Sequence, residues 1–250
     1  MLTDIYTVIW KEWKELLQFQ GSSRSGLVGL LIMVAFFAIL MPIQWGTLWV
    51  ESAASLTLWM VIPMMLVGMT VADSFAGERE RHTLETLLAS RLSDRAILLG
   101  KIFAIVSFEW VVTQLVFVVA LIPVNIMHGQ GQLLLYTPQV AFSGMLLSFL
   151  VSTLMSNIGI MISLRSPTVK QAQQKLGISV FIIAYMVPMA GVYALRYVPK
   201  ETRDALLQPI LTGDIGLAAL LASILLVFLS IGSFAITKAH FQRTRLIFND

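Results

Sequence analysis

The segment between residues 75 and 101 carries side chains suited to binding another protein. Charges of both signs cluster in its first half, at Glu78, Arg79, Glu80, Arg81 and Glu85. Three leucines with the spacing i, i+3 and i+4 stand among them, Leu84, Leu87 and Leu88. On a helix this spacing forms one apolar ridge. A ridge bordered by charges fits a groove on a partner, and the charges set its register; the alternative is an ordinary solvated connection.

Side chains that could catalyse a reaction are few in this chain. The sequence has no cysteine, which excludes a disulfide, a thiolate metal site and a cysteine nucleophile. Gly100-Lys101 lacks the earlier glycine and the following hydroxyl of a phosphate-binding loop. The 3 histidines lie in loops or at the ends of apolar segments, where a buried Ser–His pair is not expected. We therefore predict no enzymatic activity, no metal and no cofactor bound by this chain itself.

Glu109 is the one clear carboxylate within a long apolar segment. It lies roughly 10 Å from the start of the apolar segment 102–124, at a rise of 1.5 Å per residue. Ionisable residues at such a depth are costly and usually face a helix bundle or a wet cavity. Two interpretations stay open. Glu109 lines a translocation path or a proton-sensitive site, or it is an interior carboxyl that is hydrogen-bonded, for example to Thr113.

Long apolar segments must position these residues. The chain is 57% hydrophobic and 12% charged, against about 45–50% and about 25% in soluble domains. This composition excludes a soluble enzyme, a disordered chain and a nucleic-acid module. Six segments are long enough to cross a bilayer: 26–44, 53–75, 102–124, 138–164, 176–195 and 214–237. We predict an all-α integral membrane protein, a single domain over 1–250 with a six-span bundle at 26–237.

The basic residues predict the orientation of the chain in the membrane. Most of the 17 lysines and arginines fall in the N-terminal segment, in the loops 76–101 and 165–175, and in the tail 238–250. The loops 45–52 and 125–137 contain none. Because Lys and Arg concentrate on the cytoplasmic side, we expect both termini to be cytoplasmic in a multi-pass protein of the cell membrane.

The N-terminal part, residues 1–25, is predicted to be an amphipathic helix followed by a hinge. Over residues 4–19, Ile5, Val8 and Trp13 share one apolar arc, and polar side chains lie opposite. Such a helix lies on the cytoplasmic surface of the membrane. Glu12 falls inside the apolar arc, which indicates that a protein partner covers it.

A resemblance to a known family rests on residues 75–90, Phe-Ala-Gly-Glu-Arg-Glu-Arg-His-Thr-Leu-Glu-Thr-Leu-Leu-Ala-Ser. This run resembles the loop after the second span of ABC-2 type permeases, the membrane subunits of many ATP-binding-cassette exporters. The family's loop implies a cytoplasmic coupling helix at 78–90, between spans 2 and 3, that rests on an ATPase. The matching positions are Glu78, Glu80, Thr83, Leu84, Glu85, Leu87 and Leu88. Two positions depart from the family's usual pattern, His82 in place of glycine and Arg91 in place of proline. These departures affect the expected geometry of the local turns.

The resemblance implies a transport function. This chain would be the permease subunit, and two copies of an ABC ATPase subunit would bind ATP and Mg²⁺ and drive transport. A second permease chain, identical or homologous, would complete a dimer, and membrane lipid would surround it; no nucleic acid is expected. Two alternatives stay open: a membrane scaffold or assembly factor that holds a soluble partner through the same loop, and an ion-coupled carrier that uses Glu109.

Overall fold

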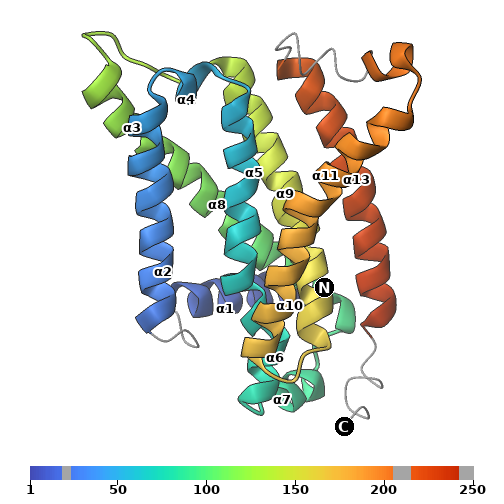
Figure 1. The fold of residues 1–250 in the computed structure, drawn as a ribbon. Coiled ribbons are helices and arrows are strands. Elements are labelled where there is room, and N and C mark those ends of the chain that lie inside the picture. Colours follow the sequence, from blue (N-terminus) through green and yellow to red (C-terminus); the bar gives the residue numbers. More distant parts are fainter. Residues whose placement is uncertain (19–23, 205–214, 242–250) are drawn as a thin grey trace.

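The computed structural model describes residues 1–18, 24–204 and 215–241. The regular elements in these ranges are all helical, as predicted. They form an upright bundle, and α1 lies across it near one end (Figure 1). The predicted hinge lies largely outside the described residues, and so does most of the tail 238–250. The helices are α1 Leu2–Gln18, α2 Arg24–Ala35, α3 Met41–Trp45, α4 Leu48–Glu51, α5 Ala54–Thr70, α6 Ala72–Glu80, α7 Leu84–Ala89, α8 Asp94–His128, α9 Pro138–Leu164, α10 Val169–Phe181, α11 Val187–Ala194 and α13 Ile215–His240.

Five helical stretches of the described chain are long and apolar enough to cross a bilayer. They are Val28–Trp45, Ala54–Glu80, Asp94–His128, Pro138–Leu164 and Ile215–Ala239. Each coincides with a predicted span, so five of the expected spans are confirmed as suitable helices. The expected span 176–195 is not among them. It falls on α10, the π-helix Ile182–Met186 and α11, a helical run divided by a change of hydrogen-bond register. The sixth span therefore stays a prediction.

Short polar side chains fix where the long helices begin. The Ser93 hydroxyl accepts a hydrogen bond from the Ala96 amide at the start of α8. Thr137 does the same for α9 and Thr168 for α10. Each bond satisfies one of the amides that the first helical turn leaves without a partner. The starts of α8, α9 and α10 are thereby set by the sequence, and α8 continues through Pro123 to His128.

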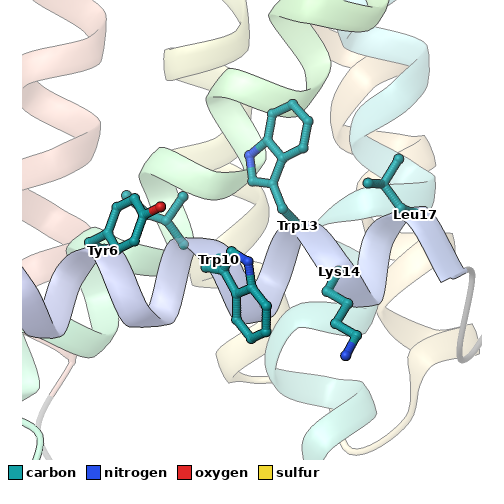
Figure 2. Close-up of a pocket in the computed structure, with 6 residues that line it drawn as sticks. Tyr6, Trp10, Trp13, Lys14 and Leu17 are labelled. Atoms are coloured by element: carbon teal, nitrogen blue, oxygen red, sulfur yellow. The ribbon is translucent and has the colours of Figure 1, made fainter.

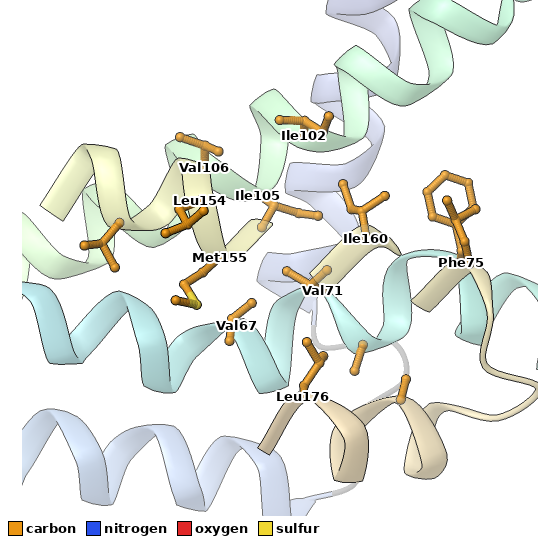
Figure 3. Close-up of a cluster of buried hydrophobic side chains, with 14 of the residues drawn as sticks. Val67, Val71, Phe75, Ile102, Ile105, Val106, Leu154, Met155, Ile160 and Leu176 are labelled. Atoms are coloured by element: carbon orange, nitrogen blue, oxygen red, sulfur yellow. The ribbon is translucent and has the colours of Figure 1, made fainter. Parts of the chain in front are cut away.

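Two buried apolar clusters hold the upright helices together. The larger joins α5, α6, α8, α9, α10 and α13 and includes Val71, Phe75 and Met155 (Figure 3). Close approach of α5 and α9 depends on glycine, because a Cβ on Gly144 would lie 2.5 Å from the Trp59 ring and one on Gly159 2.6 Å from Val71. Small residues at a helix interface allow such contacts in a membrane. The core is thus arranged around α9.

The N-terminal helix α1 packs against α8 of the same chain. Ile5 and Val8 are buried there, and a Cβ on Gly100 would lie 2.6 Å from Val8. The Trp13 indole donates a hydrogen bond of 2.8 Å to the Ser107 hydroxyl. The predicted helix is therefore present, and its apolar arc contacts protein as well as any lipid. Its position at the membrane surface stays a prediction, as does the cytoplasmic location of the termini.

Candidate functional site

The predicted coupling segment forms two helices where the sequence indicated one. It lies at the end of the bundle that α1 crosses (Figure 1). The helix α6 ends at Glu80 and α7 begins at Leu84. His82, in the turn between them, has a φ of 57°, and the Thr83 amide donates to the Glu78 carbonyl at 2.9 Å. A left-handed residue at this place is a common way to end a helix.

The left-handed turn is a conformation that favours glycine, the residue that the resemblance implies at this position. A left-handed conformation costs an ordinary residue roughly 1–2 kcal/mol, and glycine adopts it without that cost. The chain keeps the turn with His82 in place of the glycine.

Lys101 of α8 joins three helices at the centre of this region. Its side chain is 1% exposed. The ammonium lies 2.7 Å from Glu12 Oε1 on α1 and 3.1 Å from Glu78 Oε1 on α6, and it donates to the Ser74 carbonyl at 2.8 Å. It also lies 4.9 Å from the centre of the Phe75 ring. A buried lysine with this many acceptors ties α1, α6 and α8 together.

Lys11 adds a second cation to the same group, which we call the Lys101 cluster: Lys11, Glu12, Glu78 and Lys101. The Lys11 ammonium lies 2.9 Å from Glu78 Oε1. Burial alone would lower the pKa of Lys11, but Glu12, Glu78 and Glu15 outweigh it and raise the pKa. Lys11 therefore stays protonated at physiological pH. Glu12 is thus covered by its own chain and not by a partner protein. Glu78 is also buried, and its part in coupling stays a prediction.

Arg79 and Glu80, the last two residues of α6, bind the loop between α9 and α10. The Arg79 guanidinium donates to the Leu164 carbonyl at 3.0 Å and to the Ser166 carbonyl at 2.6 Å. Glu80 Oε2 accepts from the Val169 amide at 3.1 Å, which caps the start of α10. Glu80 thus binds its own chain while it stays exposed, and α6 becomes the connection between α7 and the bundle.

The leucines of α7 do not all face outward. Leu84 is buried and belongs to the same apolar cluster as Phe75 of α6, and Leu87 packs against that cluster. The side chain of Leu88 lies outside what the structure describes. Thr83, Glu85, Thr86 and Ala89 are exposed. The ridge therefore anchors α7 to its own chain, at least at Leu84, and the opposite face remains open to solvent.

Glu109 lies within the helix packing, with 0% of its surface exposed. Its Oε1 atom accepts a hydrogen bond of 2.7 Å from the Thr70 hydroxyl on α5. Thr113, the partner that the sequence suggested, donates instead to the backbone carbonyl of Glu109. Oε2 has no hydrogen-bond partner among the described residues. The burial fits the interior interpretation, and a role in a translocation path stays a prediction.

Sequence reasoning did not single out Lys101, whose side chain joins α1, α6 and α8. In the sequence, Lys101 counts only as one of the basic residues that predict the topology. The signal that could have revealed it is Glu12, whose place within an apolar arc requires a buried cation or a protein cover. The cover turned out to be Lys101 and its neighbours on the same chain.

The described helices and their apolar stretches define a multi-pass membrane protein. A comparison with protein families identifies the class of membrane protein. The model of the family described as ABC-2 family transporter protein matches residues 47–208. The match covers most of the chain and includes α6, α7 and the Lys101 position. The chain therefore belongs to the ABC-2 family, as a transport membrane subunit of a kind that associates with an ABC ATPase. A comparison with curated proteins found no match.

Proposed function

We propose that this chain is the permease subunit of an ABC-2 type exporter driven by ATP hydrolysis on a separate ATPase. ATP and Mg²⁺ bind that ATPase, which is present in two copies. A second permease chain, identical or homologous, completes the pathway, because six helices alone are few for a transport path. The family match does not favour the alternatives of a scaffold or of an ion-coupled carrier.

The observation that carries this proposal is the set of contacts made by α6. Leu84 anchors α7 in the cluster that α6 shares. Glu78 binds α1 and α8 through the two lysines, and Arg79 and Glu80 bind the loop before α10. A movement imposed on α7 by an ATPase would therefore reach α1, α8 and α10. The segment 78–90 acts in this proposal as the coupling element.

The exposed face of α7 is the part of this element that would contact the ATPase. It presents Glu85, Thr86 and Ala89, and the turn before it presents Thr83. In this proposal Leu84 and Leu87 fix the helix, while Glu85 and its neighbours recognise the partner. Glu78 and Glu80 act indirectly, since both bind residues of their own chain.

The test is affinity purification of the permease from its native host in mild detergent, with the copurified ATPase quantified. The double variant Glu85→Arg with Ala89→Arg should lose the ATPase, because two bulky cations replace a carboxylate and a methyl group on the docking face. The control variant Glu51→Arg with Gln139→Arg also introduces two arginines, at exposed positions of the opposite end of the bundle. This control should retain the ATPase. Retention at wild-type stoichiometry by the α7 variant would contradict the proposal.

ATP turnover separates a transporter from a scaffold. The wild-type complex should hydrolyse ATP in a vanadate-sensitive manner, and the α7 double variant should lose the part of that activity that depends on the permease. A copurifying partner without vanadate-sensitive turnover would favour the scaffold.

The proposed topology has six spans, with both termini and residues 76–101 in the cytoplasm. The chain has no cysteine, so single cysteines report their side without background. In intact cells an impermeant maleimide should label Tyr197→Cys, which follows α11, and should not label Glu85→Cys. Labelling at position 85 would show that the loop 76–101 lies outside the cell, which contradicts the predicted orientation. If position 197 is labelled only after the cells are opened, the segment 176–195 does not cross the membrane and the sixth span is wrong.

Glu109 is proposed to act as an interior carboxyl that holds α8 to α5 through Thr70. Glu109→Gln keeps an acceptor for the Thr70 hydroxyl, so complex assembly and the pH dependence of ATP turnover should match the wild type. A changed pH dependence with normal assembly would instead favour a place in the translocation path.

A further inference from the structure

One side of α1 carries an apolar groove with a volume of about 510 Å³. It is lined by Tyr6, Ile9, Trp10, Trp13, Lys14 and Leu17. Figure 2 shows Trp13 and Leu17 on one side of the helix and the Lys14 side chain on the other. Tyr6, Trp10 and Leu17 are exposed. The groove is thus an open apolar surface next to a cation.

The groove lies beside the bundle-facing side of α1. At about 100° per residue, Ile5 and Val8, which pack on α8, occupy neighbouring directions. Around the helix axis, the apolar residues of the groove occupy the directions next to these two, beginning with Ile9 and ending with Trp10. Lys14 lies beyond Trp10, at the border with the polar arc. Aromatic side chains on an apolar arc with lysine at its edge are the composition of helices that lie in the membrane interface.

Within the described part of the chain, no carboxylate forms an ion pair with Lys14. Among the described residues, the ion pairs of α1 other than that of the N-terminus involve Lys11, which contacts Glu12, Glu15 and Glu78, and Glu12, which also contacts Lys101. The Lys14 ammonium instead lies 5.4 Å from the centre of the Trp10 ring. It therefore holds a positive charge directly at the groove.

We propose that this groove binds an anionic phospholipid, with the phosphate at Lys14 and one acyl chain along the arc between Trp10 and Trp13. The inner wall is already formed in the protein. The Trp13 indole is fixed by its hydrogen bond to Ser107 and by an edge contact with Phe108 at 5.6 Å between ring centres. A lysine beside an anionic membrane strengthens binding about fivefold.

The experiment measures lipid binding to the full-length chain by native mass spectrometry in mild detergent. The probes are dioleoyl phosphatidylglycerol and dioleoyl phosphatidylcholine, which share their acyl chains and differ in net charge. The wild type should bind phosphatidylglycerol about fivefold more tightly. Lys14→Gln should abolish that difference and leave phosphatidylcholine binding unchanged. Trp10→Ala should weaken the binding of both lipids.

The control is Lys175→Gln, which removes an exposed lysine of α10 and should change neither affinity. An equal loss in Lys175→Gln would overturn the proposal, because it indicates diffuse attraction between charges. Equal binding of the two lipids by the wild type would also overturn it. So would competition by soluble glycerol phosphate at the concentration of the lipid, since the acyl chain would then contribute nothing. If Trp10→Ala does not fold, Tyr6→Ala tests the same arc.

Discussion

The two ends of the bundle are held together by different chemistry. At the end crossed by α1, buried ion pairs around Lys101 connect α1, α6 and α8. At the opposite end the contacts are aromatic. Trp59 stacks on Phe117 with 3.9 Å between ring centres, and Trp49 stacks on the same ring at 5.6 Å.

The difference predicts how each end responds to damage. A buried ion pair that loses one partner leaves an uncompensated charge, so its cost is high and falls on every helix it joins. Apolar and aromatic contacts are many and individually small, and they can be lost in part. The charged end is therefore fixed as one unit, which suits a region that transmits movement from α7. The aromatic end should tolerate conservative changes better.

Lys101→Met should have the largest effect. The methionine fills a similar volume but leaves the Glu12 and Glu78 carboxylates buried with Lys11 alone. We expect a loss of about 3–5 kcal/mol in the free energy of unfolding, measured by tryptophan fluorescence during thermal unfolding in detergent. Lys175→Met, at an exposed position of α10, is the matched control and should change stability little.

A triple variant sharpens the same comparison. Lys101→Met combined with Glu12→Gln and Glu78→Gln removes the charges together with their partner, and should recover part of the lost stability. If the single variant is as stable as the wild type, the Lys101 cluster does not hold this end of the bundle.

Tyr136→Phe should have a smaller effect at the aromatic end. The Tyr136 hydroxyl accepts from the Trp49 indole at 2.8 Å and donates to the Phe117 carbonyl at 2.9 Å. Its removal leaves the indole N–H without this partner, at a cost of about 1–3 kcal/mol, while the ring contacts remain. The same thermal measurement gives the value. A loss as large as that of Lys101→Met would remove the contrast between the two ends.

The sequence predicted those features that are encoded locally. Apolar runs marked the helices because bilayer thickness sets their length. The turn at His82, which divides the expected helix 78–90 into α6 and α7, was not predicted. Contacts between distant residues were not predicted. Lys101 binds a glutamate that lies 89 residues away, and Glu109 binds a threonine 39 residues away. Glu12 in its apolar arc signals that a partner is needed, but such pairs leave no spacing in the sequence, so the identity of each partner follows only from the packing of the helices.

His82→Gly should have the smallest effect, and it should be stabilising. Glycine removes the left-handed cost of roughly 1–2 kcal/mol but adds about 0.5–1 kcal/mol of backbone entropy in the unfolded chain. The net gain is therefore at most about 1.5 kcal/mol. At about 2–4 °C per kcal/mol for a chain of this size, Tm should rise by no more than about 6 °C.

Gln130→Gly provides the matched comparison at the opposite end of the bundle. Gln130 has a φ of 43° and is exposed in the loop after α8, so the same balance of costs applies there. Because both positions gain through the local backbone alone, the two variants should stabilise the protein by similar amounts. A loss of stability in His82→Gly alone would show that the imidazole makes a contact at the charged end, and that this turn is held by more than its backbone.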